Sequence, residues 1–223
     1  MGEEMLKLAE RYCLALVEQH LLEMCEPIQL GCSPSGCERA IQTLQAALEA
    51  NPDHAALHID ASNMYNSCDR GSSSALQVCF DDSKLALIWR VLSFAYSHPS
   101  HLLIRQGGHV VDSFLSENGG RQGDCLAGLI CSRLFQSVYQ SAVEDQDGKA
   151  LDVTARAIMD DCSVVGSPAD LLKVFDTYQR LALSHGVTVH ADSCIQIPQG
   201  LPSAILVQAA DNRGLKIVCG NTD

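Results

Sequence analysis

Two β-prone segments that lie far apart in the sequence constrain the fold of this chain more than any other feature. Residues 55–62 (AALHIDAS) are short, mostly apolar and bounded by turn residues, which predicts a buried strand. Residues 153–166 (VTARAIMDDCSVVG) predict two short strands around a tight Asp-Asp turn, because Asp tolerates the left-handed conformation that such turns use. If the two strand regions are neighbours, Asp60, Asp160 and Asp161 converge at one edge of a sheet.

The rest of the chain is dominated by helical patterns. Apolar residues at helical spacing predict helices at about 4–24, 37–48, 83–96, 126–138 and 167–186. Gly119 and Gly120 predict a flexible loop, and short strands are expected near 187–197 and 204–219. Repeats, low-complexity tracts and linkers are not visible in the sequence. The chain is therefore expected to form one α+β unit.

Composition narrows the classes of function. The 223 residues suffice for one sizeable hydrophobic core. Asp and Glu total 27 against 15 Lys and Arg, which gives a formal charge of −12. This balance counts against a protein whose affinity comes mainly from neutralising phosphates. No apolar run approaches the roughly 20 residues of a membrane span, so no membrane partner is expected.

The eleven cysteines indicate a reducing compartment. Their number is odd, no CxxC occurs, and the N-terminal residues lack the core of a signal peptide. They are therefore interpreted as reduced, mostly buried thiols of an intracellular protein. Cys32 and Cys37 are a weak alternative as metal ligands, because no second cysteine pair or His-x-x-x-His completes a zinc site. The sequence shows no basic cluster of the kind that directs nuclear import, so it does not distinguish a nuclear from a cytoplasmic location.

Asp60, Asp160 and Asp161 are the candidate catalytic residues. Two hard divalent cations roughly 3.5–4 Å apart require a cluster of oxygen ligands such as three carboxylates. Spacing alone favours a solvated turn and an unrelated aspartate at a strand end, because Asp-Asp pairs are common in turns.

Six segments, taken in chain order, resemble one family of polymerases. They are residues 27–41 (PIQLGCSPSGCERAI), 58–70 (HIDASNMYNSCDR), 116–135 (SENGGRQGDCLAGLICSRLF), 157–166 (AIMDDCSVVG), 186–194 (GVTVHADSC) and 214–220 (GLKIVCG). The second, third and fourth resemble motifs A, B and C of reverse transcriptases. The first is similar to a stretch that precedes motif A in non-LTR (LINE-like) retrotransposons. The chain thus resembles the reverse transcriptase (RNA-directed DNA polymerase) domain of such an element.

The resemblance implies an architecture. The fold would be a reverse-transcriptase palm, an antiparallel sheet of the split βαβ type with helices packed on one face. Residues 1–54 would be partial fingers and a helical lead-in, and residues 55–223 would form the palm that carries motifs A, B and C. A thumb is not expected, and the chain is interpreted as truncated.

The resemblance also implies an activity and its residues. The chain would add deoxynucleoside triphosphates to the 3′-hydroxyl of a DNA primer on an RNA template, with two Mg²⁺ ions or Mn²⁺ in their place. The implied metal ligands and catalytic residues are Asp60, Asp160 and Asp161. Tyr65 would exclude a ribose 2′-hydroxyl, and Gln122 and Gly123 would lie along the incoming nucleotide.

Some residues depart from the family pattern, and two alternatives remain open. Ile158 stands where the family hairpin usually has an aromatic, Cys125 replaces a proline, and Ser193 stands where a lysine is common, with His190 the nearest base. The first alternative is a catalytically inactive or domesticated reverse-transcriptase relic that acts as an interaction module. The second, a nucleotide cyclase palm, is disfavoured by the Gln-Gly-Asp helix start at 122–124.

Overall fold

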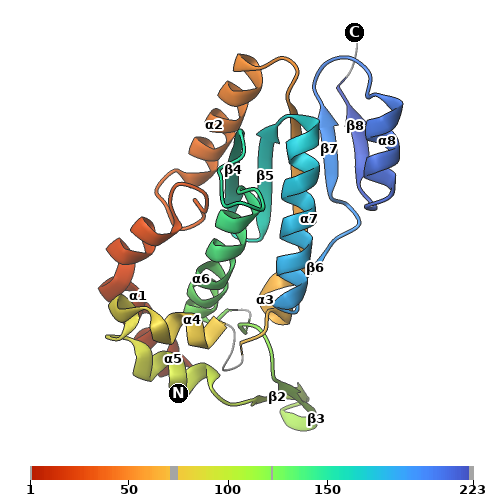
Figure 1. Cartoon of the computed structure of the whole chain (residues 1–223). Helices are drawn as coiled ribbons and strands as arrows, with labels where there is room; N and C mark the ends of the chain where they lie inside the picture. Colours follow the sequence, from red (N-terminus) through yellow and green to blue (C-terminus); the bar gives the residue numbers. More distant parts are fainter. Residues whose placement is uncertain (1, 71–74, 122, 221–223) are drawn as a thin grey trace. The chain divides into compact units, whose positions relative to one another are not determined.

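The computed structural model describes residues 2–70, 75–121 and 123–220, which form two compact units (Figure 1). The first unit consists of Met1–Met24 and Asn63–Leu134, and the second of Cys25–Ser62 and Phe135–Asp223. The predicted division between fingers and palm after residue 54 falls inside the second unit, so it does not coincide with a boundary between units.

The second unit contains the main sheet. Its strand order is β4 (Val153–Ile158), β5 (Asp161–Gly166), β1 (Ala55–Ser62), β7 (Cys194–Ile197) and β8 (Lys216–Cys219), and the short β6 (Thr188–Val189) also pairs with β1 (Figure 1). All pairs are antiparallel except β7–β8, which is parallel and departs from the predicted antiparallel sheet.

The predicted hairpin is present, but its turn is shifted by one residue. Met159 and Asp160 connect β4 to β5, and Asp161 is the first residue of β5 rather than part of the turn. The left-handed residue is Met159, with φ 57°, and not an aspartate as the sequence suggested. The turn can hold Met159 in this conformation because side chains from Gln29 and Tyr139 bind its backbone.

One face of the sheet is buried and the other is open. Leu57, Ile59 and Ala61 of β1 are buried, whereas His58 and Asp60 between them are half-exposed. On the open face, Nδ1 of His58 is hydrogen-bonded to Oγ of Ser163 at 2.9 Å. This alternation is the mark of a sheet with helices on one side, as expected for a palm.

Helices α2 (Gly36–Ala50), α7 (Pro168–Ser184) and α8 (Ala204–Asp211) pack against this sheet. Helix α7 begins as predicted, with Pro168 at its first position and Oγ of Ser167 accepting the N–H of Asp170. The strand predicted for 204–219 is wrong in its first half. Oγ of Ser203 accepts the N–H of Leu206 and starts helix α8, so only the last part forms β8.

The first unit is built from helices and one hairpin. It contains nearly all of α1 (Gly2–Cys25), then α3 (Met64–Ser67), α4 (Ala75–Asp81), α5 (Trp89–Tyr96) and the first part of α6 (Cys125–Ala142). The helix predicted for 83–96 is split into a 3₁₀ turn at Ser83–Leu85 and α5. Strands β2 (Ser100–Gln106) and β3 (His109–Ser116) were not expected from the sequence.

None of the helices in the described part of the chain combines the length and apolar character needed to cross a membrane.

Candidate active site

The acidic cluster lies at the end of two neighbouring strands. In the antiparallel β1–β5 pair, Asp60 is directly opposite Asp161, and Ile59 is opposite Cys162. Directly opposed residues have side chains on the same face of a sheet, with Cβ atoms about 5 Å apart. Asp160 precedes Asp161 in the β4–β5 turn. The sequence-based expectation that these two strand regions are neighbours is therefore confirmed.

The carboxylates of this cluster affect one another. Partial burial raises the pKa of Asp161, and the nearby negative charges of Asp160 and Asp60 raise it further. The Asp60 side chain is 47% exposed, so it can be reached from solvent. A shift with these causes is expected where carboxylates gather.

The donor chemistry suits Mg²⁺, because carboxylate oxygens are its preferred protein ligands. The positions of the side chains do not yet form a complete metal site. Among residues 2–70, 75–121 and 123–220, no three His, Cys, Asp or Glu side chains are grouped so that they could hold a metal ion. Cation binding at this cluster would require side-chain rotations in Asp60, Asp160 or Asp161.

Gln29 holds the turn that carries Asp160, and sequence reasoning missed it. Its side chain is fully buried. Nε2 donates to the carbonyl of Met159 at 2.8 Å, and Oε1 accepts the N–H groups of Met159 at 3.0 Å and of Gly31 at 2.8 Å. The hydroxyl of Tyr139 donates to the same Met159 carbonyl at 3.1 Å. The backbone of the turn is thus fixed immediately before Asp160.

His190, Asp192 and Lys216 form a series of polar contacts that ends at Asp60. Nδ1 of His190 lies 3.5 Å from Oδ2 of Asp60 and 3.3 Å from Oδ2 of Asp192. The Lys216 ammonium forms an ion pair with Asp192, and together with His190 it lowers the pKa of that carboxyl. Lys216 was not identified from the sequence, because it lies on β8, far from Asp60 along the chain.

Ser193, which stands where the family often has a lysine, has a structural role. It is buried, and its Oγ accepts the backbone N–H of Asp60 at 3.1 Å. The backbone N–H of His190 in turn donates to the carbonyl of Asp60 at 2.8 Å. Both contacts fix the main chain of the residue that carries the first predicted metal ligand.

Tyr65, the predicted sugar gate, lies on α3 in the first unit and is half-buried. Its carbonyl accepts the N–H of Gly120 at 2.6 Å, and the carbonyl of Cys68 accepts the N–H of Gly119 at 2.8 Å. A Cβ atom on Gly119 would lie 2.2 Å from the carbonyl oxygen of Tyr65. The loop predicted at Gly119–Gly120 is present, but hydrogen bonds hold its backbone, and these glycines permit a close approach of two backbones.

The other predicted substrate residues lie in the same segment. Gly123 is exposed with φ 92°, and a Cβ atom there would have open space. Gln122 lies outside the described residues. Of the two residues expected along the incoming nucleotide, Gly123 therefore lies on accessible surface of the first unit.

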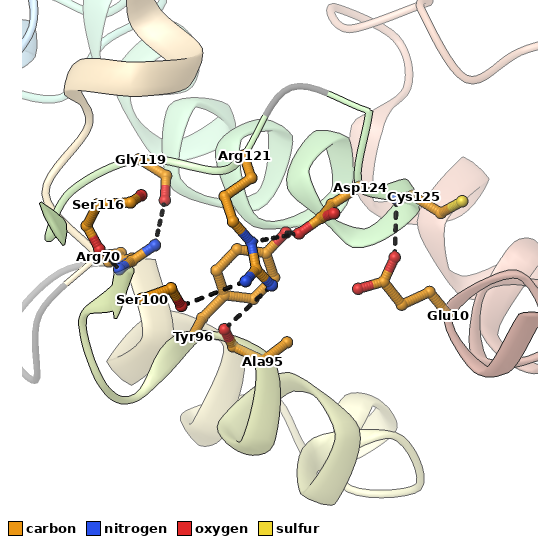
Figure 2. A network of polar contacts seen from close by, with 10 residues as sticks. All are labelled: Glu10, Arg70, Ala95, Tyr96, Ser100, Ser116, Gly119, Arg121, Asp124 and Cys125. Carbon is orange, nitrogen blue, oxygen red and sulfur yellow. Dashed lines mark hydrogen bonds and ion pairs between the residues drawn. The ribbon is translucent and has the colours of Figure 1, made fainter. Parts of the chain in front are cut away.

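A network of charged and aromatic side chains holds the loop between β3 and α6 in place on both sides of Gly120 (Figure 2). The Arg70 guanidinium donates to the carbonyls of Ser116 and Gly119. Nε of Arg121 donates to Oδ2 of Asp124 at 2.7 Å, and the same oxygen accepts the hydroxyl of Tyr96 at 3.0 Å. Both guanidinium groups lie over the Tyr96 ring, 5.6 and 5.4 Å from its centroid.

Glu10 caps the helix that follows this segment. Its side chain is completely buried, and Oε2 accepts the N–H of Cys125, the first residue of α6, at 3.0 Å (Figure 2). An acidic side chain at a helix N-terminus is favoured by the helix dipole. Burial nevertheless raises the pKa of Glu10, and the backbone N–H of Cys125 offsets this only in part.

The fold was compared with those of known proteins. No protein-family model matches the chain, and no curated protein matches its sequence significantly. Among solved structures, apo telomerase from Candida tropicalis, truncated from its C-terminal domain, is similar with a TM-score of 0.56 and 13% identity over 86% of this chain. Telomerase from Candida albicans, in complex with a fragment of telomeric RNA, is similar with a TM-score of 0.58 and 10% identity over 88% of this chain.

The fold of this chain is therefore similar to that of the aligned parts of these two telomerases. The predicted α+β palm is thereby confirmed. The chain corresponds to 41% of the Candida tropicalis telomerase chain and to 34% of the Candida albicans one.

Proposed function

We propose that this reverse-transcriptase-like chain is an RNA-directed DNA polymerase domain of non-LTR retrotransposon type. It adds deoxynucleotides to a DNA primer paired with an RNA template. The observation that supports this most is the pairing of Asp60 with Asp161, next to Asp160, on the open face of the sheet. The lineage rests on the six segments that resemble these enzymes in order.

The three carboxylates have distinct positions in the proposed chemistry. Asp60 and Asp160 are the principal ligands of two Mg²⁺ ions, and Asp161 is beside them. The bound cations supply charge neutralisation for phosphoryl transfer and lower the pKa of the primer 3′-hydroxyl. Gln29 keeps the Asp160 turn in place, and Ser193 and His190 keep the main chain of Asp60 in place. The protein thus mainly positions negative charge before the reaction.

Tyr65 and the segment after Gly120 are the proposed residues that select deoxynucleotides over ribonucleotides and position them. The Tyr65 ring excludes the 2′-hydroxyl of a ribonucleotide, and Gln122 and Gly123 lie along the incoming nucleotide. The hydrogen bond from Gly120 to the Tyr65 carbonyl supports a coupling between the two motifs, because it joins them through the backbone.

One observation favours the alternative of a non-catalytic interaction module. The β2–β3 hairpin exposes large apolar side chains on both of its faces, and exposed apolar surface marks interaction sites. These residues are Leu103, Ile104, Val110, Val111, Phe114 and Leu115.

Primer extension on an RNA template with deoxynucleotides and Mg²⁺ or Mn²⁺ tests the proposal. Asp160→Asn keeps the side-chain shape and removes a ligand charge, so extension should fall by roughly a hundredfold or more, the equivalent of about 3 kcal/mol. Asp211→Asn, an exposed aspartate at the end of α8, is the matched control and should keep full activity.

Two results would contradict the proposal in different ways. Equal primer extension by both variants would show that Asp160 is not a catalytic residue. Absence of extension by the unmodified chain would favour the interaction module.

A further inference from the structure

Cys68 and Cys131 form a close thiol pair in the first unit. Their sulfur atoms are 3.3 Å apart, although the residues are separated by 63 positions in the sequence. Both side chains are 0% exposed, and both cysteines are reduced. A disulfide bond is about 2.05 Å long, so joining the two sulfurs requires an approach of little more than an ångström.

The two cysteines lie on elements that are already held together. Cys68 is the C-cap of α3, and its N–H donates to the Met64 carbonyl at 2.9 Å. Its own carbonyl accepts the N–H of Gly119, which leads into α6, the helix that contains Cys131. The backbone of Cys68 is therefore hydrogen-bonded to the segment that precedes the helix containing Cys131.

We infer that Cys68 and Cys131 are a site of oxidation, at which hydrogen peroxide converts the thiol pair into an intramolecular disulfide. The inference is independent of the proposed polymerase activity, because it concerns only the two sulfurs and their surroundings.

The electrostatic surroundings give the two sulfurs different roles. The hydrogen bond between the two thiols lowers the pKa of Cys68, and the nearby Arg70 acts in the same direction, whereas burial and Asp69 oppose it. The pKa of Cys131 is raised, first by the hydrogen bond with Cys68 and then by burial. The positive charge of Arg70 near Cys68 favours Cys68 as the nucleophilic thiolate and Cys131 as the resolving thiol.

The reaction balances with one peroxide per pair. The Cys68 thiolate attacks one peroxide oxygen, the O–O bond breaks, and the products are a sulfenic acid on Cys68 and hydroxide. The Cys131 sulfur then attacks the Cys68 sulfur, the S–O bond breaks, and the oxygen leaves as water with the thiol proton. In sum, two thiols and one peroxide give one disulfide and two water molecules. The oxidant must be small, because both sulfurs are buried.

The competing thiols are Cys79 and Cys125. Cys79 is buried and close enough to contribute to the raised pKa of Cys131, while burial raises its own pKa to about 12. A thiol of so high a pKa is a poor nucleophile at neutral pH. Cys125 is half-buried, and its thiol is directed to the carbonyl of Lys7.

Peptide mapping of the folded full-length chain tests the inference. Accessible thiols are first blocked with N-ethylmaleimide, and the protein is then treated with hydrogen peroxide, denatured, alkylated and digested with trypsin. Cleavage at Lys and Arg places Cys68 in residues 40–70 and Cys131, together with Cys125, in residues 122–133. The expected product is these two peptides joined, with a mass two hydrogens below their sum and with loss of the joined species on reduction.

Three controls assign the bond. Cys125→Ser and Cys79→Ala should retain the joined peptides, whereas Cys131→Ala should lose them. Oxidation of the unmodified chain in concentrated urea should spread the cross-links over many cysteine pairs, because the specificity comes from the fold. Fragmentation of the joined peptide assigns the sulfur in the unmodified chain even if a variant fails to fold.

The inference is overturned by any of three results. Cys68 could be blocked by N-ethylmaleimide before oxidation, which would contradict its burial. Cys68 could remain a free thiol after peroxide treatment of the folded chain. The bond could instead join Cys68 to Cys79 or Cys125.

Discussion

Single buried polar residues fix the backbone beside the proposed functional residues. In the second unit, Gln29 binds both backbone groups of Met159, directly before Asp160. In the first unit, Arg70 binds the carbonyl of Gly119, directly before the glycine that contacts Tyr65. A buried amide or guanidinium group that can form its hydrogen bonds in just one backbone conformation makes that conformation rigid. These two residues are therefore part of the functional architecture, although neither would touch substrate.

Glu10 gives a pH-dependent prediction. Its folded-state pKa lies above the ordinary value of 4.5, because the carboxylate is buried. A raised pKa contributes stability below the unfolded-state value, and this contribution is lost as the pH rises through the folded-state value. Glu10→Gln keeps an acceptor for the Cys125 N–H and carries no charge. From about pH 4 to about pH 8 its free energy of unfolding should therefore rise relative to the unmodified chain, on the order of 1 kcal/mol.

Urea unfolding at several pH values measures this difference. Glu18→Gln, on the exposed face of the same helix, is the matched control and should show a smaller change. An identical pH dependence of unfolding for the two variants would show that burial does not raise the pKa of Glu10.

At the scale of helices and strands, the sequence predicted correctly those elements that are formed by interactions between neighbouring residues. The strand at Ala55–Ser62 and the start of α7 at Ser167–Pro168 follow from residues adjacent in the sequence, and both are confirmed. The conformation of Gly119–Gly120 depends on hydrogen bonds to Cys68 and Tyr65, which are distant in the sequence. The hairpin at 100–116 did have a local signal, the Gly107–Gly108 turn between two apolar runs.

The same distinction applies to the candidate site. The three aspartates were found from the sequence because they follow β-prone segments and match motifs. Gln29 could not be found in this way, since its partner Met159 is 130 positions away and only the tertiary fold brings them together. Lys216 was missed for the same reason, because a strand that pairs with β7 carries it to Asp192.

Two glycines near motif B give opposite predictions. A methyl group at Gly119 would meet the Tyr65 carbonyl at 2.2 Å, and φ is 64°, so Gly119→Ala should lower the free energy of unfolding by about 2–4 kcal/mol. Gly128 lies within α6 with open space around it, so Gly128→Ala should raise the free energy of unfolding by about 0.5–1 kcal/mol.

Chemical denaturation of both variants measures the two effects. The opposite signs separate the close backbone approach from a general sensitivity of this region to added volume. A stable Gly119→Ala variant would indicate that the contact between Gly119 and Tyr65 is not formed.

At the scale of the whole molecule, the chain alternates between its units. It passes between them after Met24, after Ser62 and after Leu134, and the second passage comes two residues after Asp60. The proposed metal ligands all belong to the second unit, and Tyr65 and Gly123 belong to the first. Each set is held by contacts within its own unit, so the acid cluster can be tested without assuming anything about the gate.

The net charge of −12 also bears on the proposed chemistry. An acidic protein does not attract a polyanionic template by its overall field. The acids on the open sheet face do favour divalent cations, and a bound cation would reverse the local charge where a triphosphate must approach. Cation binding is thus the step on which the proposed function depends.

Binding of Mn²⁺, followed by electron paramagnetic resonance with Mg²⁺ as competitor, tests that step most directly. The unmodified chain should bind Mn²⁺, and Asp60→Asn and Asp160→Asn should each weaken binding about tenfold or more, whereas Asp211→Asn should leave it unchanged. Equal binding by all four proteins, or no binding by the unmodified chain, would contradict a cation site formed by Asp60, Asp160 and Asp161.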